Sequence, residues 1–108
     1  MALGVKNGSE VIVPNRTWIA TAHAAMILGA TVKLVDVKAD KLIIDENLII
    51  DELNENTKVI IPVHMLGVSA EIEKIIQIAK KHKIKVLEDN CESIGAKFSK
   101  KYLGTLAD

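Results

Sequence analysis

Short runs of β-branched residues alternate along this chain with segments of helical patterning, and this alternation limits the folds available to it. The runs cover residues 10–14, 31–37, 58–64 and 85–89, and the helical segments cover 17–28, 46–53 and about 69–83. Strands that alternate with helices favour a parallel sheet with right-handed crossovers. We therefore predict an α/β fold with a mainly parallel sheet and flanking helices.

The first helical segment, residues 17–28, is rich in alanine and apolar on nearly every side. A helix of that composition is expected to be buried rather than amphipathic. Thr17 or Asn15 is the predicted N-cap, because both residue types accept hydrogen bonds from the first turn. Gly29 is the predicted end of this helix.

The third helical segment has the clearest periodicity. Ser69 is its predicted start, and Ile72, Ile75, Ile76 and Ala79 follow at i, i+3, i+4 and i+7. This spacing builds one apolar stripe, which is typical of a helix that packs on a sheet.

The sequence also predicts a short helix, a hairpin and incomplete chain ends. Asp45 is the predicted cap of helix 46–53, and residues 95–104 are predicted to form a hairpin. Residues 1–8 resemble the end of an earlier helix, and residues 105–108 do not resemble a finished terminus. We therefore expect residues 1–108 to be a single incomplete domain, a fragment of a larger protein.

Composition argues against several classes of function. The 14 basic residues equal the 14 acidic ones, so no net charge attracts nucleic acid or a membrane surface. No apolar run approaches the roughly 18 residues that span a bilayer. A single cysteine forms no internal disulfide and fits a reducing cytoplasm. No Cys or His spacing typical of zinc is present, so no metal site is predicted.

Two strand ends carry the candidate site residues. Asp89 closes the run at 85–89, and Trp18, the only tryptophan, follows the strand that ends at Pro14. Ligands of open α/β sheets bind just beyond the carboxyl ends of the strands. A carboxylate and an aromatic plane there could hold a flat, positively charged cofactor, such as one with a protonated ring nitrogen.

Simpler interpretations stay open for the same residues. Asp89 could cap a turn, and Trp18 could be part of the core. His64, at the end of the third run, is more often a hydrogen-bonded structural histidine than a ligand. Cys91 has no positive neighbours in the sequence that would lower its thiol pKa, so we predict that it is not a nucleophile.

The order of the motifs resembles the DegT/StrS family of sugar aminotransferases, which use pyridoxal phosphate (PLP) on the type I aminotransferase fold. The resemblance covers essentially the whole chain. It rests on Gly8-Ser9-Glu10-Val11-Ile12-Val13-Pro14, Thr17-Trp18-Ile19-Ala20-Thr21, Leu28-Gly29-Ala30, Val35-Asp36-Val37, Asn56 to His64, Val86-Leu87-Glu88-Asp89 and Gly104 to Asp108.

The resemblance assigns roles to three residues. Asp89 matches the aspartate that pairs with the pyridine nitrogen of PLP, and Trp18 matches the aromatic residue that stacks on its ring. Glu92 stands where many members have Gln or His near the ring hydroxyl. The resemblance also places the Schiff-base lysine beyond Asp108 and the phosphate-binding segment before Met1, so no catalytic residue is assigned within the chain.

The resemblance implies an enzyme that transfers an amino group from glutamate to a nucleotide-linked keto-deoxysugar, as in perosamine-type amino sugar synthesis. It also implies a cytoplasmic homodimer when the protein is complete. The stretch from Glu88 to Ala96 more closely resembles deoxysugar 3-dehydrases, which share the fold and cofactor but have His in place of the lysine. A non-catalytic α/β binding module is the third interpretation.

Overall fold

The computed structural model describes all residues from Met1 to Asp108 and contains the predicted parallel sheet. Its four strands run in the order β2-β1-β3-β4, and every neighbouring pair is parallel. Their bounds are Glu10–Pro14 for β1, Thr31–Val35 for β2, Thr57–Ile60 for β3 and Lys85–Val86 for β4. The α/β fold class predicted from the alternation is confirmed.

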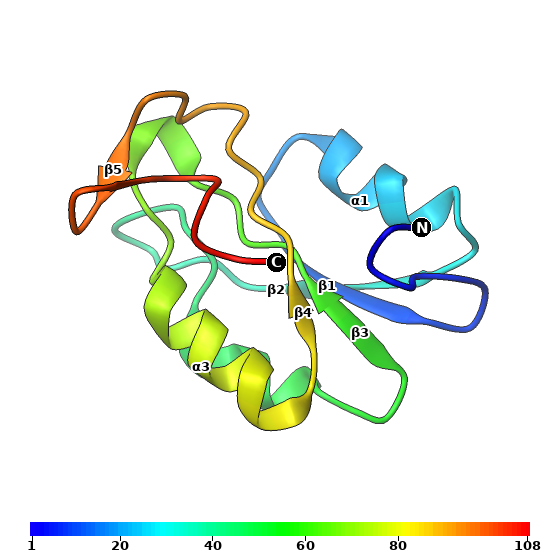
Figure 1. The fold of residues 1–108 in the computed structure, drawn as a ribbon. Helices are drawn as coiled ribbons and strands as arrows, with labels where there is room; N and C mark the ends of the chain where they lie inside the picture. The colour runs from blue at the N-terminus through cyan, green and yellow to red at the C-terminus, as the bar shows by residue number, and fades with distance from the viewer.

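Helices cover both faces of this sheet (Figure 1). The connections contain α1 (Ile19–Met26), α2 (Glu46–Ile49), α3 (Ile72–His82) and the 3-10 turns η1 (Ile50–Glu52) and η2 (Met65–Gly67). The predicted hairpin is present as the antiparallel pair β5 (Lys97–Phe98) and β6 (Lys101–Tyr102).

The core has two halves because neighbouring residues of a strand face opposite sides of the sheet. On β1, Ile12 joins a cluster with residues of α2 and α3, whereas Val11 and Val13 join a cluster with Ala22 and Ala25 of α1. The sheet is therefore the middle layer, with α1 on one face and α3 on the other.

The prediction that α1 is buried is wrong for this chain. Only Thr21, Ala22 and Ala25 are buried, whereas Ile19 and Met26 are exposed. Small residues line the side that contacts the sheet, and larger apolar residues lie on the outer side. The predicted caps are also wrong, because Trp18 occupies the N-cap position and no side chain caps the helix.

The apolar stripe of α3 packs as predicted, with Ile72, Ile75 and Ala79 buried. The helix begins later than predicted, since the Ser69 hydroxyl donates to the carbonyl of Ala70 instead of capping the first turn. Lys83 ends the helix in the left-handed conformation, with φ 58°. The predicted cap of α2 is confirmed, since the Asp45 side chain accepts from the Asn47 amide.

Regular pairing of β3 with β4 stops earlier than the sequence predicts, and Pro62 gives the reason. Beyond Val86, the Leu87 amide still donates to Ile60 (3.0 Å) and the Asp89 amide to Pro62 (2.9 Å). Proline has no N–H, so the ladder loses one bond at this point. The His64 amide then restores the ladder by donating to the carbonyl of Asp89 at 3.0 Å. Asp89 is thus fixed at the carboxyl end of the sheet although it lies outside β4.

None of the helices is both long and apolar enough to cross a membrane.

Candidate functional site

The sheet has a topological switch point between β1 and β3. From β1 the chain crosses through α1 to β2, whereas from β3 it crosses through α3 to β4 on the other side. The two connections leave β1 and β3 in opposite directions, which opens a crevice at the carboxyl ends of these strands. Ligands of open α/β sheets bind at such a crevice.

A cavity of about 460 Å³ lies at this end of the sheet. Its walls come from the first turns of α1 and from the segment after β4. All three sequence-predicted site residues, Trp18, Asp89 and Glu92, line it together with Thr21 and Cys91. The structure therefore brings together residues that are up to 74 positions apart, counted from Trp18 to Glu92.

Asp89 is held as an anion by donors on both carboxylate oxygens. The Thr21 hydroxyl donates to Oδ2 at 2.7 Å, and the Cys91 amide donates to Oδ1 at 3.2 Å. Burial raises the pKa of Asp89, but hydrogen bonds from Cys91 and Thr21 outweigh it, so the pKa lies below its ordinary value. An ionised carboxylate at a cavity wall can bind a cationic group of a ligand.

Trp18 is not a core residue, because 72% of its surface is exposed. Its backbone is extended, with φ −65° and ψ 139°, and α1 begins at the next residue. The indole therefore lies at the rim of the cavity, where its face can stack on a flat ligand.

Glu92 also lines the cavity, and its carboxylate Oε2 accepts from the Leu66 amide at 3.3 Å. The Cys91 side chain is exposed, and its hydrogen bond to the Asp89 carboxylate is the main cause that raises the pKa of its thiol. A thiol with a raised pKa is a poor nucleophile at neutral pH, in agreement with the prediction from sequence.

His64 is a hydrogen-bonded structural histidine, which is the role that the sequence favoured over that of a ligand. The ring is fully buried; Nδ1 accepts from the Ala70 amide at 3.1 Å, so Nε2 carries the proton. Nε2 lies 3.0 Å from Oε2 of Glu88 and donates to it.

Glu88 was not predicted from the sequence as a functional residue, and it anchors residues 104–107. Its carboxylate accepts from the amides of Gly104 (2.9 Å), Leu106 (2.7 Å) and Ala107 (2.8 Å). Burial raises the pKa of Glu88, but the hydrogen bonds from these amides and from His64 lower it by more. The pKa therefore lies below its ordinary value. The signal for Glu88 was a charged residue directly after the apolar pair Val86-Leu87, near the carboxyl end of the strand.

Thr21 was also missed as a site residue. Thr21 lies three residues after Trp18 inside the predicted helix 17–28, and this spacing could have indicated that the two residues lie near each other.

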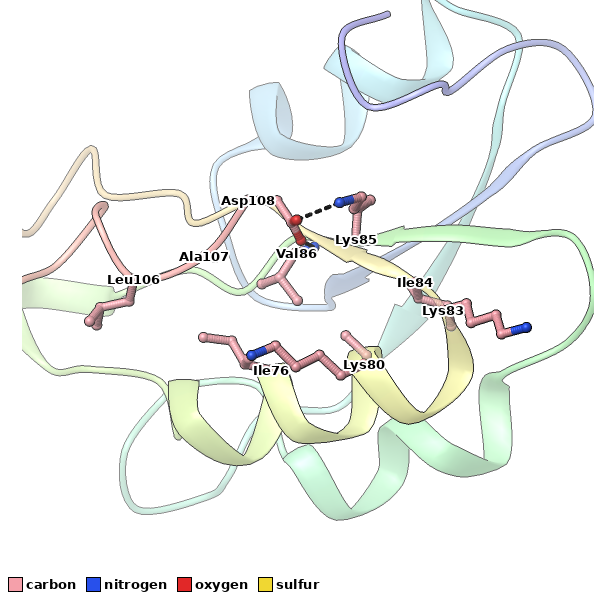
Figure 2. A pocket seen from close by; sticks show the side chains of 10 residues that line it. Ile76, Lys80, Lys83, Ile84, Lys85, Val86, Leu106, Ala107 and Asp108 are labelled. Atoms are coloured by element: carbon pink, nitrogen blue, oxygen red, sulfur yellow. Dashed lines mark hydrogen bonds and ion pairs between the residues drawn. The ribbon is translucent and has the colours of Figure 1, made fainter.

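A second cavity, of about 520 Å³, lies away from these residues (Figure 2). It is bounded by α3, β4 and residues 106–108, with Lys80 and Lys83 on the helix side. Lys85 Nζ and Asp108 Oδ1 form an ion pair of 2.6 Å beside it (Figure 2). This cavity contains none of the predicted site residues.

The family assignment follows from the whole chain. The model of the DegT/DnrJ/EryC1/StrS aminotransferase family matches residues 1–108. The chain belongs to this family, and its sheet and flanking helices are part of the type I fold of PLP-dependent enzymes.

Three solved structures illustrate the similarity. An aminotransferase from Psychrobacter cryohalolentis is 33% identical with a TM-score of 0.95, and 98% of this chain aligns with 27% of that one. E. coli GDP-4-keto-6-deoxy-D-mannose-3-dehydratase with bound hydrated PLP is 37% identical with a TM-score of 0.87, over 94% of this chain and 26% of that one. NtdA from Bacillus subtilis with bound cofactor PMP is also 37% identical with a TM-score of 0.87, over 94% and 23%.

The chain thus spans about a quarter of the length of each of these proteins. Aminotransferases and dehydratases both occur among the structural relatives, so the similarity defines the fold and the family without choosing between the two reactions.

Proposed function

We propose that this chain is part of the cofactor-binding domain of a PLP-dependent aminotransferase that acts on a nucleotide-linked keto-deoxysugar. The observation that carries the proposal is the ionised Asp89 carboxylate in a cavity at the switch point, with Trp18 at the rim. Membership of the family and the PLP or PMP in the names of related structures support it.

The residues present fit a pyridoxal ring. Asp89 offers a negative charge to a protonated ring nitrogen, and the exposed Trp18 offers a flat face. When bound, PLP supplies an electron sink for the carbanion formed on an amino acid or sugar carbon. Asp89 would maintain the ring charge on which that sink depends, Trp18 would hold the ring plane, and Glu92 would lie near the ring hydroxyl.

We further propose glutamate as the amino donor, a perosamine-type amino sugar as the product, a cytoplasmic location and a homodimer. These parts of the proposal rest on the family alone. The lysine that would bind the cofactor covalently is proposed to lie beyond Asp108.

A deoxysugar 3-dehydrase is the second candidate. The segment that contains Glu88 and Glu92 resembles that branch, and the E. coli dehydratase is 37% identical over 94% of this chain. The coding sequence after the codon of Asp108 separates the candidates. A lysine in a Ser-Phe-His-x-x-Lys context would support the aminotransferase, and a histidine in its place would support the dehydrase.

The test of the residue assignment compares two strand-end aspartates in the protein encoded by the whole reading frame. Asp89→Ala should weaken PLP binding and slow the glutamate-dependent reaction on the order of 100-fold, because a charge-assisted hydrogen bond contributes about 1.5–3 kcal/mol. Asp36→Ala is the matched control, since Asp36 is exposed and accepts a hydrogen bond from Asn15 away from the cavity.

Binding is measured from the absorbance of the bound cofactor. Turnover is measured from the change in this absorbance when glutamate is added. Equal effects of the two substitutions would refute the assignment of Asp89. A cooperative unfolding transition of isolated residues 1–108, with no effect of PLP, would instead favour the non-catalytic binding module.

A further inference from the structure

A chain of hydrogen bonds connects α1 to the strand end that carries Asp89. The hydroxyls of Thr17 and Thr21 lie 3.0 Å apart, and Thr21 Oγ1 lies 2.7 Å from Oδ2 of Asp89. Thr21 is 68 residues from Asp89 in the sequence and is buried. This contact joins the two walls of the cavity.

The direction of this chain is fixed by its last member. An ionised carboxylate only accepts hydrogen bonds, and a threonine hydroxyl has a single proton to donate. Thr21 therefore donates to Asp89, and Thr17 in turn donates to Thr21. All of these donors point toward the carboxylate.

The remaining contacts of Asp89 leave room for a ligand. Oδ1 accepts from the Cys91 amide, and Oδ2 accepts from Thr21. The Cys91 thiol also donates to this carboxylate. A carboxylate has about four lone-pair sites, so at least one stays available for a cationic N–H in the cavity. The Thr21 bond also limits rotation of the carboxylate plane, because it holds one oxygen against the helix.

We propose that Thr21 is a positioning residue that orients the Asp89 carboxylate toward the cavity and preserves its negative charge for a protonated cofactor ring. The inference rests on the proposed function. Without the Thr21 hydroxyl, a partly buried carboxylate loses a strong donor, and its protonation becomes easier. A neutral Asp89 would no longer balance the charge of the ring nitrogen.

Three variants of the whole protein test this role. Thr21→Val has nearly the same shape but no hydroxyl, and Thr21→Ser restores the hydroxyl. Thr57→Val is the matched control, because Thr57 is also buried and its hydroxyl accepts from the Asn54 amide at the amino end of β3. It removes a buried hydroxyl far from the cavity.

Two readouts are measured for each variant. The first is the titration of Asp89, followed by NMR of its labelled carboxyl carbon in the cofactor-free protein and assigned by comparison with Asp89→Asn. The second is the dissociation constant of PLP. Thr21→Val should raise the pKa of Asp89 and weaken PLP binding about tenfold or more, since one hydrogen bond to a charged group is lost. Thr21→Ser and Thr57→Val should match the wild type in both readouts.

An unchanged Asp89 titration in Thr21→Val, or a loss of PLP affinity of equal size in Thr57→Val, would overturn the role of Thr21. If Thr21→Val does not fold, Thr21→Ala is read by the same criteria. Absence of PLP binding by the wild type would refute the proposed function, whereas the Asp89 titration would still decide whether Thr21 controls this carboxylate.

Discussion

Replacement of Glu88 by glutamine tests how the end of the chain is attached to the sheet. Oε1 of Glu88 accepts from the amides of Leu106 and Ala107, and Oε2 accepts from the Gly104 amide and His64 Nε2. Its side chain is only 3% exposed, so water replaces none of these donors. Glutamine keeps the shape of this side chain but has one acceptor oxygen and one donor nitrogen.

The expected cost follows from the geometry. If the glutamine oxygen keeps the bonds to Leu106 and Ala107, its amide group faces the N–H groups of Gly104 and His64. The other tautomer of His64 would not remove this conflict, because its Nδ1 proton would then face the N–H of Ala70. Two hydrogen bonds to a charged acceptor are lost, each contributing about 1.5–3 kcal/mol, so the free energy of unfolding should fall by about 3–6 kcal/mol.

The assay is urea unfolding of the protein from the whole reading frame, together with hydrogen exchange. Glu88→Gln should speed exchange at the amides of Gly104, Leu106 and Ala107. Glu55→Gln is the control, because Glu55 is exposed and its carboxylate makes no hydrogen bond or ion pair. Exchange at these amides that is unchanged in Glu88→Gln would refute the reasoning.

The pH dependence gives an independent check. The pKa of folded Glu88 lies below the ordinary value of 4.5, so the folded state favours the charged form. Its stabilisation is therefore complete above about pH 4.5 and is lost as the pH falls through the lower folded pKa. The stability difference between wild type and Glu88→Gln should shrink in acid, and a constant difference would contradict the assignment.

Two further predictions concern the cavity and the core. Asp89→Asn should speed alkylation of Cys91 by iodoacetamide near pH 8, because the Asp89 carboxylate raises the thiol pKa, and equal rates would contradict this interaction. Ile12→Ala should lower the free energy of unfolding by about 2–5 kcal/mol, because Ile12 is fully buried in the sheet. Ile27→Ala, at a site that is 84% exposed, should change it by less than about 0.5 kcal/mol, and similar losses in both variants would argue against this core.

Local patterns in the sequence were sufficient to predict the layers of the fold. The β-branched run of β1 has the predicted bounds, and the apolar stripe of α3 faces the sheet. Strand ends are visible in a sequence, and parallel strands bring their carboxyl ends to one edge. The approach of Trp18 and Asp89 to one cavity was predictable for that reason.

Tertiary structure alone decided which partners these residues have. The bond from Thr21 to Asp89 and the four donors around Glu88 join segments with no periodic relation in the sequence. Likewise, the composition of α1 indicated an apolar helix but not which side would be covered. Periodicity reports which side of an element is apolar, whereas hydrogen-bond partners depend on strand order and register, which only the folded chain defines.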